Sequence, residues 1–240
     1  MYYIDFLARL HHLLSPRTYL EIGVRRGHSL ALSKCRSIGI DPNLQIDQVL
    51  GRDTRLVETT SDEYFADLHA RDAAPFARLP VDLAFIDGMH LFEYALRDFA
   101  NVERHAGPNT VVVFDDMFPR NVDEAARDRH TQEWTGDVFR VMLALDRHRP
   151  DLTLTRVDTQ PTGLLLVTGF SAERRFTSEE VESIVAKELK PDPQSIPSAV
   201  LTRKGALAPE DALDLPLWPR LASSRAPRHR WFVRGFRHRA

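Results

Sequence analysis

Cysteine is almost absent from this sequence, because Cys35 is the one thiol among 240 residues. The chain therefore cannot hold an internal disulfide framework or a zinc site built on cysteines. Long apolar runs are absent too, since acids and histidines interrupt the first segment, MYYIDFLARLHHLL. We expect neither a signal peptide nor a membrane-spanning helix, and we predict a cytoplasmic protein.

Acids are missing from the last stretch, SSRAPRHRWFVRGFRHRA (223–240), which holds six arginines. All 34 Asp and Glu residues precede it, so the body of the protein is acidic and its tail is basic. The acidic body argues against a nucleic-acid enzyme, and we expect no nucleic-acid partner. The tail could contact an acidic partner or a membrane surface. Alternatively, it is a solvated terminus or packs on a second copy of the chain, in a homo-oligomer such as a dimer.

Short apolar runs alternate with amphipathic segments over residues 18–169, which is typical of βαβ units and a parallel sheet. The pattern predicts an α/β protein with one doubly wound sheet. The expected strands are 18–23, 36–41, 55–60, 81–87 and 110–116, followed by a hairpin of 152–158 and 162–169. The expected helices are 2–14, 27–34, 61–70, 91–105, 137–148 and 177–189, with a turn at 107–109.

A polar stretch at 117–134 interrupts this rhythm directly after an expected strand. A long loop at a strand end is typically a lid or a site loop. Trp134 could line a substrate pocket, and Asp137 could cap the helix that follows or hydrogen-bond a sugar hydroxyl. We divide the chain into an N-terminal helix (1–15), a central domain (16–170), and a C-terminal helix with the basic tail (171–240).

The first strand runs into a glycine turn, EIGVRRGHS (21–29). Glycines at such a turn let a ligand approach the backbone closely. The spacing of Gly23 and Gly27 differs from the dinucleotide pattern G-x-G-x-x-G, and Glu21 would repel a pyrophosphate but attract an ammonium or sulfonium group. Asp41, at the end of the second strand, could accept both hydroxyls of a ribose. The set favours S-adenosylmethionine, while a structural hydrogen bond for Glu21 and a helix cap for Asp41 are the alternatives.

Four segments together resemble class I S-adenosylmethionine-dependent methyltransferases: YLEIGVRRGHSLAL, GIDP, FIDGMHLFEYALRDF and VVVFDDM. The resemblance spans roughly residues 15–170 and is nearest to the bacterial group of macrocin O-methyltransferase-like enzymes. It implies a Rossmann-like methyltransferase fold, with a mostly parallel seven-stranded sheet and an antiparallel terminal hairpin. The residues expected to bind the cofactor are Glu21, Gly23, Gly27, Ser29, Asp41, Ser61 and Asp87, although Ser61 could instead cap a helix.

Three aspartates follow two expected strands, Asp87 after one and Asp115 with Asp116 after the next. The carboxyl ends of neighbouring parallel strands lie beside the ligand crevice, so these side chains should converge there. Crowded carboxylates repel one another unless a proton or a cation separates them, and Mg²⁺ prefers oxygen ligands. The resemblance to catechol and macrolide-sugar O-methyltransferases implies that all three bind Mg²⁺. Caps and strand-end hydrogen bonds are the structural alternative.

His90 stands where catechol O-methyltransferase has its catalytic lysine, so the resemblance implies that it acts as a general base together with Asp87. Macrolide-type relatives often have a second acid at the position of Met89, and its loss places the proton transfer on His90 or on the metal. A helix-capping or supporting histidine is the alternative interpretation of His90.

The sequence thus predicts an S-adenosylmethionine-dependent, Mg²⁺-assisted O-methyltransferase that acts on a hydroxyl of a small molecule or a glycosyl substrate. One alternative is an NAD-dependent oxidoreductase of Rossmann type, against which Glu21 and the missing third glycine speak. A non-catalytic, cofactor-binding member of the same fold is another, and so is N-methylation at a metal-free site.

Overall fold

The computed structural model describes residues 1–225 of the chain. The partner contacts expected of the basic tail fall almost entirely on residues 226–240 and lie outside the described residues. No helix within residues 1–225 is long and apolar enough to cross a membrane.

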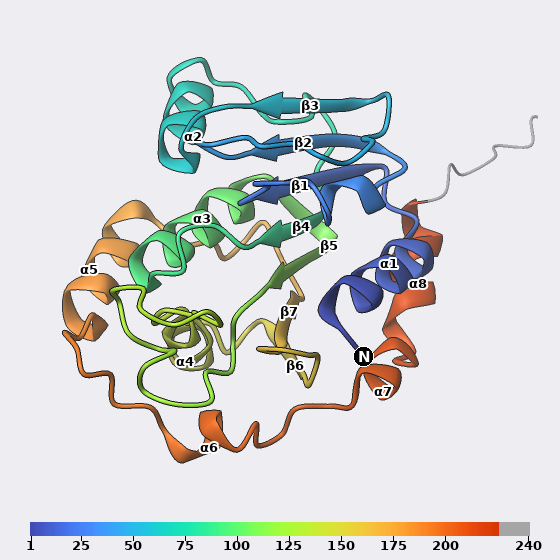
Figure 1. The fold of residues 1–240 in the computed structure, drawn as a ribbon. Coiled ribbons are helices and arrows are strands. Elements are labelled where there is room, and N and C mark those ends of the chain that lie inside the picture. The colour runs from blue at the N-terminus through green and yellow to red at the C-terminus, as the bar shows by residue number, and fades with distance from the viewer. Residues whose placement is uncertain (226–240) are drawn as a thin grey trace, which may run out of the picture.

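A seven-stranded sheet forms the centre of the protein, in the order β3-β2-β1-β4-β5-β7-β6 (Figure 1). Neighbouring strands from β3 to β5 pair in parallel, whereas β7 pairs antiparallel with both β5 and β6. This arrangement confirms the predicted doubly wound sheet and its terminal hairpin. The strands are β1 (Thr18–Ile22), β2 (Arg36–Ile40), β3 (Thr54–Val57), β4 (Val81–Ile86), β5 (Ala106–Phe114), β6 (Thr153–Val157) and β7 (Leu164–Thr168).

Helices cover both faces of the sheet, because successive side chains of each buried strand point to opposite faces. In β4, Ala84 and Ile86 pack into one core and Leu83 and Phe85 into the other. The first core lies under α2 (Ser61–Ala70), α3 (Phe92–Arg104), α4 (Phe139–His148), α5 (Ser178–Glu188) and the short α6 (Ser198–Leu201). The second lies under α1 (Tyr3–Leu14), the 3₁₀ turn η1 (Leu30–Leu32), α7 (Pro209–Leu213) and α8 (Leu217–Arg225).

The helix predicted for 27–34 is wrong, since only the 3₁₀ turn η1 forms there. The serines of this segment bond outside a helix. Ser29 donates to Glu21, and the Ser33 hydroxyl accepts from Ser37 and from the backbone N–H of Cys35. Side-chain bonds of this kind compete with helical backbone bonds. The β1–β2 connection is consequently a compact loop.

The turn predicted at 107–109 is also wrong, because these residues lie within β5. The pairing of β4 with β5 shifts there, so that Val81 pairs with Ala106 but Leu83 pairs with Val111. The extra residues form a bulge at the start of the strand. Thr110 closes it by donating to the Val81 carbonyl and accepting from the Gly107 N–H. The other predicted helices and strands are present, with shifts at their ends.

The C-terminal segment returns to the layer that contains α1. After α5 packs against α3 and α4, the chain runs along the outside, and α7 and α8 then lie against α1 (Figure 1). Trp218 of α8 is 1% exposed, and its indole N–H donates to the Ala212 carbonyl over 2.7 Å. These residues thus supply part of the second core.

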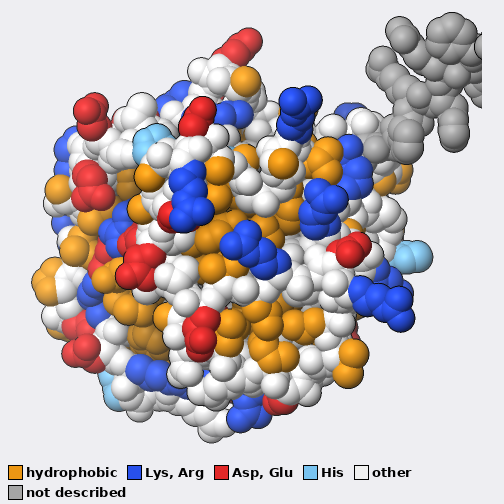
Figure 2. Space-filling view, turned by 90° about the horizontal axis from the view of Figure 1, so that it is seen from above, with side chains coloured by type: hydrophobic (Ala, Val, Ile, Leu, Met, Phe, Trp, Pro, Cys, Tyr) orange, Lys and Arg blue, Asp and Glu red, His pale blue; other side chains and the backbone are white. Residues whose placement is uncertain are grey.

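The end of the sheet formed by β3 is uppermost in Figure 1 and faces the reader in Figure 2. Hydrophobic side chains on this face are interspersed with both basic and acidic ones. The visible face is therefore not a surface of one charge sign.

We expect Trp218→Ala to lower the free energy of unfolding by about 3–5 kcal/mol, because it empties a fully packed site in the second core. Urea unfolding monitored by circular dichroism measures this loss. Leu201→Ala is the control, since Leu201 is 41% exposed and its truncation should cost less than about 1 kcal/mol. Equal losses in the two variants would contradict a structural role for α8.

Candidate active site

Acidic side chains gather at the carboxyl edge of the sheet. Asp87 directly follows β4 and Asp115 directly follows β5, and these parallel strands are neighbours. Backbone bonds extend the sheet to both residues, because the Asp87 N–H donates to Ile22 and the Asp115 N–H donates to Ile86. The aspartates predicted from the strand ends therefore lie side by side.

His90 lies between the carboxylates of Asp87 and Asp116, the residue that follows Asp115. Its Nδ1 atom is 2.7 Å from Asp116 Oδ2, and its Nε2 atom is 3.3 Å from Asp87 Oδ1. Ligand atoms of Asp87, His90 and Asp116 all lie within 4.8 Å of one another, close enough to share one metal ion. Asp115 is not part of this group, and its Oδ1 accepts the backbone N–H of Asp116 over 2.8 Å. The cluster thus differs from the predicted three aspartates by containing His90 in place of Asp115.

Burial and mutual charge set the protonation of this cluster. Burial disfavours the charged form of His90, but the carboxylates of Asp116 and Asp87 outweigh it and raise the His90 pKa well above its usual value. Burial, with repulsion from Asp116 and Asp87, raises the pKa of Asp115 well above the normal range. Burial also raises the pKa of Asp87. In the ligand-free chain the two acids thus favour the protonated form of the imidazole that lies between them.

The loop after β5 holds His90 in place. The indole ring of Trp134 stacks on the imidazole, with ring centroids 5.1 Å apart and planes 3° apart. The indole N–H of Trp134 in turn donates to the Ala126 carbonyl over 2.6 Å. A Cβ atom on Gly136 would lie 1.8 Å from the His90 carbonyl oxygen, so only glycine permits this approach. Trp134 therefore contacts the site through His90.

Asp137 caps a different helix from the one predicted. Its Oδ1 accepts the backbone N–H of Phe92 over 2.7 Å, which satisfies a free donor at the start of α3 rather than of α4. Its Oδ2 is 2.6 Å from Arg127, which also pairs with Glu93 of α3. Asp137 is completely buried. This ion-pair network fastens the loop that carries Trp134 to the beginning of α3.

Glu21 lies inside the fold behind the glycine turn. It is completely buried, and its two oxygens pair with the hydroxyls of Tyr19 and Ser29 over 2.6 and 2.7 Å. Burial raises the pKa of Glu21 to about 8, so the residue is mostly protonated at neutral pH. In the ligand-free chain Glu21 therefore makes structural hydrogen bonds, which was the alternative to a role in binding the cofactor.

The glycine turn itself is pressed against the end of β4. Gly23 has a φ of +88°, and a Cβ atom there would lie 1.9 Å from the Asp87 carbonyl oxygen. Gly27, with φ +83°, closes the turn through its N–H bond to Val24. The turn thus presents bare backbone directly beside Asp87.

Asp41 follows β2 and fixes the loop around it. Its carboxylate accepts the backbone N–H groups of Arg25 and Asn43 over 2.8 and 2.7 Å. Each carboxylate oxygen has a further lone pair for a ligand. The residue therefore caps two loop segments and not a helix.

Ser61 begins α2 but does not cap it. Thr60 is the N-cap, in a capping box with Glu63, so the alternative interpretation of Ser61 as a helix cap does not hold. Ser61 hydrogen-bonds Asp98 of α3, whose pKa is raised to about 7 by burial. Sequence reasoning missed Asp98 because an acid on an amphipathic helix is usually assigned to the solvent face.

Similarity to known proteins bears on this geometry. Residues 20–117 match the family model described as a methyltransferase domain. Over these residues the chain is similar to methyltransferases. The predicted resemblance to methyltransferases is thereby confirmed, while membership of the macrocin-like group stays a prediction. No curated protein sequence matches the chain significantly.

Solved structures of methyltransferases share the fold of this chain. Cofactor-bound Rv0187 from MTB is 17% identical with a TM-score of 0.54, over 71% of this chain and 82% of that one. The O-methyltransferase TomG from Streptomyces achromogenes, in complex with SAM, is 20% identical with a TM-score of 0.52, over 70% and 79%. The SAH-bound Podospora anserina methyltransferase PaMTH1 is 12% identical with a TM-score of 0.52, over 70% and 78%.

Tyr3 is a further residue near this site. Burial, and the repulsion that a phenolate would meet from Asp87, Asp115, Asp116 and Glu21, raise its pKa far above the usual value, so the phenol stays protonated. The sequence predicted an amphipathic helix over 2–14 but did not single out Tyr3 within it.

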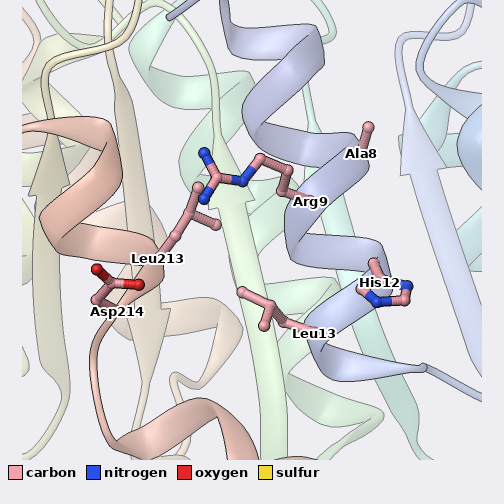
Figure 3. Close-up of a pocket in the computed structure, with 6 residues that line it drawn as sticks. All are labelled: Ala8, Arg9, His12, Leu13, Leu213 and Asp214. Carbon is pink, nitrogen blue, oxygen red and sulfur yellow. The ribbon is translucent and has the colours of Figure 1, made fainter.

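A cavity of about 420 Å³ lies elsewhere, between α1 and α7 (Figure 3). Arg9 extends from α1 toward Leu213, and Asp214 stands on the other side. The α1 residues that line the cavity come from the later part of the helix. That part leads into the start of β1, whereas the carboxylate cluster lies at the ends of the parallel strands. This cavity is therefore separate from the carboxylate cluster.

We expect Asp137→Ala to lower the free energy of unfolding by about 3 kcal/mol or more, because it removes the cap of α3 and one partner of a buried ion pair. Chemical denaturation measures the change. Asp67→Ala removes an exposed ion pair with Arg71 and should cost less than about 1 kcal/mol. Similar losses in both variants would contradict the fastening role of Asp137.

A second expectation concerns pH. The folded-state pKa of Glu21 is raised to about 8, so its contribution to stability is fully present below its ordinary pKa of 4.5 and is lost as pH rises through about 8. The side chain of the Glu21→Gln variant does not titrate. Between about pH 5 and pH 8, the unfolding free energy of this variant should therefore decrease by about 3 kcal/mol less than that of the wild type.

Urea unfolding at a series of pH values tests this expectation. The exposed Glu173 supplies the control, because Glu173→Gln should keep the wild-type pH dependence. A Glu21→Gln curve that runs parallel to the wild type would show that Glu21 is already ionised in the folded chain.

Proposed function

We propose that this protein is an S-adenosylmethionine-dependent O-methyltransferase, assisted by a divalent cation such as Mg²⁺. Its acceptor would be a hydroxyl of a small molecule or a glycosyl substrate. The convergence of Asp87, His90 and Asp116 beside the glycine turn carries the proposal. It is supported by TomG, an O-methyltransferase of similar fold whose structure is a complex with SAM.

The carboxyl edge of the sheet fits S-adenosylmethionine in shape and charge. Gly23 leaves its backbone bare beside Asp87, whose carboxylate can accept an ammonium group. Asp41 stands at the end of the next strand with lone pairs free for ribose hydroxyls. Gly27 lies in the loop between β1 and β2, and Ser61 lies at the start of α2 after β3. The cofactor supplies a methyl group that its sulfonium already activates for transfer.

The cluster also fits a divalent cation. Asp87 and Asp116 offer the hard oxygen ligands that Mg²⁺ prefers, which leaves the His90 imidazole available for proton transfer. Asp115 orders Asp116 by accepting its backbone N–H. Such an ion would polarise the acceptor hydroxyl and lower its pKa.

His90 would then handle the acceptor proton. The charges of Asp87 and Asp116 raise the pKa of the His90 imidazole. A cation bound to both acids would cancel this effect and lower the pKa of the imidazole. Nε2 is the freer nitrogen, because Nδ1 is 2.7 Å from Asp116 and 3.1 Å from the Trp134 carbonyl. Stacking on Trp134 fixes the plane of the ring, so the direction of proton transfer is set in advance.

Calorimetry with S-adenosylhomocysteine and with Mn²⁺ tests both parts of the proposal. We expect the wild type to bind both, and we expect Asp116→Asn to weaken Mn²⁺ binding about 100-fold while the affinity for S-adenosylhomocysteine changes little. Asp67→Asn is the control, since this exposed acid of α2 pairs with Arg71. It should bind both ligands like the wild type.

The outcomes separate cleanly. Absence of S-adenosylhomocysteine binding would overturn the proposed activity and favour a different ligand for the fold. Binding of S-adenosylhomocysteine without Mn²⁺ would overturn the cation. In that case the His90 imidazolium is itself the charge that separates Asp87 from Asp116, and a metal-free site is the better description. The acceptor, the homo-oligomer, the cytoplasmic location and the three-part domain division stay predictions.

A further inference from the structure

The beginning of α1 lies at the same edge of the sheet as the carboxylate cluster. The helix has 12 residues and is about 18 Å long, close to the length of about 17 Å for the five residues of β1. Only three residues separate the end of α1 from the start of β1. Because the helix packs back along the sheet, its first turn must lie near the carboxyl end of β1.

Hydrogen bonds place this first turn independently. The Tyr3 N–H donates to the Gln160 carbonyl over 3.0 Å, and the Gln160 N–H donates to the Met1 carbonyl over 2.9 Å. Gln160 belongs to the turn between β6 and β7, and β7 starts beside the end of β5, where Leu165 pairs with Phe114. The β6–β7 turn therefore ties the first turn of α1 to the carboxyl edge.

The same turn is itself firmly held. Arg203 donates to the carbonyls of Thr159 and Pro161 and pairs with Asp158. On its other side, the Phe118 N–H donates to Thr162 over 2.7 Å. The position of Tyr3 is thus set by the fold as a whole.

The Tyr3 ring packs over β4, the strand that leads into the cluster. The ring stacks on Phe85, with centroids 6.4 Å apart, and Phe85 pairs with Glu21 of β1 on one side and Val113 of β5 on the other. Asp87 and Asp115 follow these strands with the same facing as Phe85 and Val113, since side chains alternate along a strand. The half-buried phenol has no hydrogen-bond partner within residues 1–225.

We propose that Tyr3 is a ligand-binding residue whose hydroxyl donates a hydrogen bond to the carboxylate of the amino-acid part of the cofactor. The inference rests on the proposed use of S-adenosylmethionine.

The charges around Tyr3 favour this ligand group. An amino-acid moiety carries an ammonium, for which Asp87 is an acceptor, and a carboxylate, which the crowded acids would repel. A carboxylate can bind among these acids only where neutral or positive donors face it. Tyr3 supplies such a donor near Asp87, from the helix that packs over Phe85. The α1 layer thus supplies a contact that the sheet edge alone lacks.

Two nucleosides isolate the contact. S-adenosylhomocysteine carries the amino-acid part, whereas 5′-methylthioadenosine keeps the adenosine and the thioether but lacks it. We expect Tyr3→Phe to weaken S-adenosylhomocysteine binding about 10-fold, the usual loss for a hydrogen bond to a charged group, and to leave 5′-methylthioadenosine binding unchanged. Calorimetry on the full chain without added metal measures both.

The neighbouring residue gives a matched control. Tyr2 is 62% exposed, and Tyr2→Phe should bind both nucleosides like the wild type. Tyr3→Phe keeps the ring on Phe85, so its melting temperature should match that of the wild type. Unchanged S-adenosylhomocysteine binding, or an equal loss for both nucleosides, would overturn the role of Tyr3. Failure of the wild type to bind S-adenosylhomocysteine would instead overturn the proposed function on which it rests.

Discussion

Negative charge held in a small volume is the constraint around which the carboxyl edge of this sheet is built. Asp87 and Asp115 continue two hydrogen-bonded parallel strands, so the sheet fixes their separation and repulsion cannot push them apart. The chain relieves the repulsion by raising the pKa of Asp115 and by placing His90 between Asp87 and Asp116. A bound cation or ammonium group would relieve the same repulsion. This edge of the sheet therefore favours a positively charged ligand.

Much of the remaining structure keeps those groups from relaxing. His90 and Asp116 both have left-handed backbone conformations, with φ of +56° and +61°, which cost about 1–3 kcal/mol each for residues other than glycine. Such conformations persist only when the surroundings determine them. Trp134 stacks on His90, and Asp137 fastens the Trp134 loop to α3. The strain lies at the two residues that face each other across the cluster, where a pre-organised site needs it.

The sequence was informative wherever a local pattern fixes the outcome. Apolar runs ending in acids predicted β4, β5 and the meeting of their aspartates, because parallel strands finish at one edge. It was less informative where a side chain can hydrogen-bond either a neighbour in the sequence or a distant residue. Ser29 bonds Glu21 rather than supporting a helix, and Asp137 caps a helix 45 positions earlier in the chain. No periodicity reports such choices.

The pairing of His90 with Asp116 and the proximity of Tyr3 were beyond sequence reasoning for a related reason. Both depend on loops, one after β5 and one between β6 and β7, whose paths are set by tertiary contacts. Residue types could suggest that these groups matter to chemistry. Their distances required the fold.

The packing of α8 on α1 also bears on how the protein is made. The first helix leaves the ribosome well before the residues that cover it, including Trp218. Contacts so distant in sequence form late, since the loops that they close are long. The layer that carries Tyr3 therefore closes only after α8 has been synthesised, and a nascent chain that ends before α8 would expose the apolar face of α1 to chaperones.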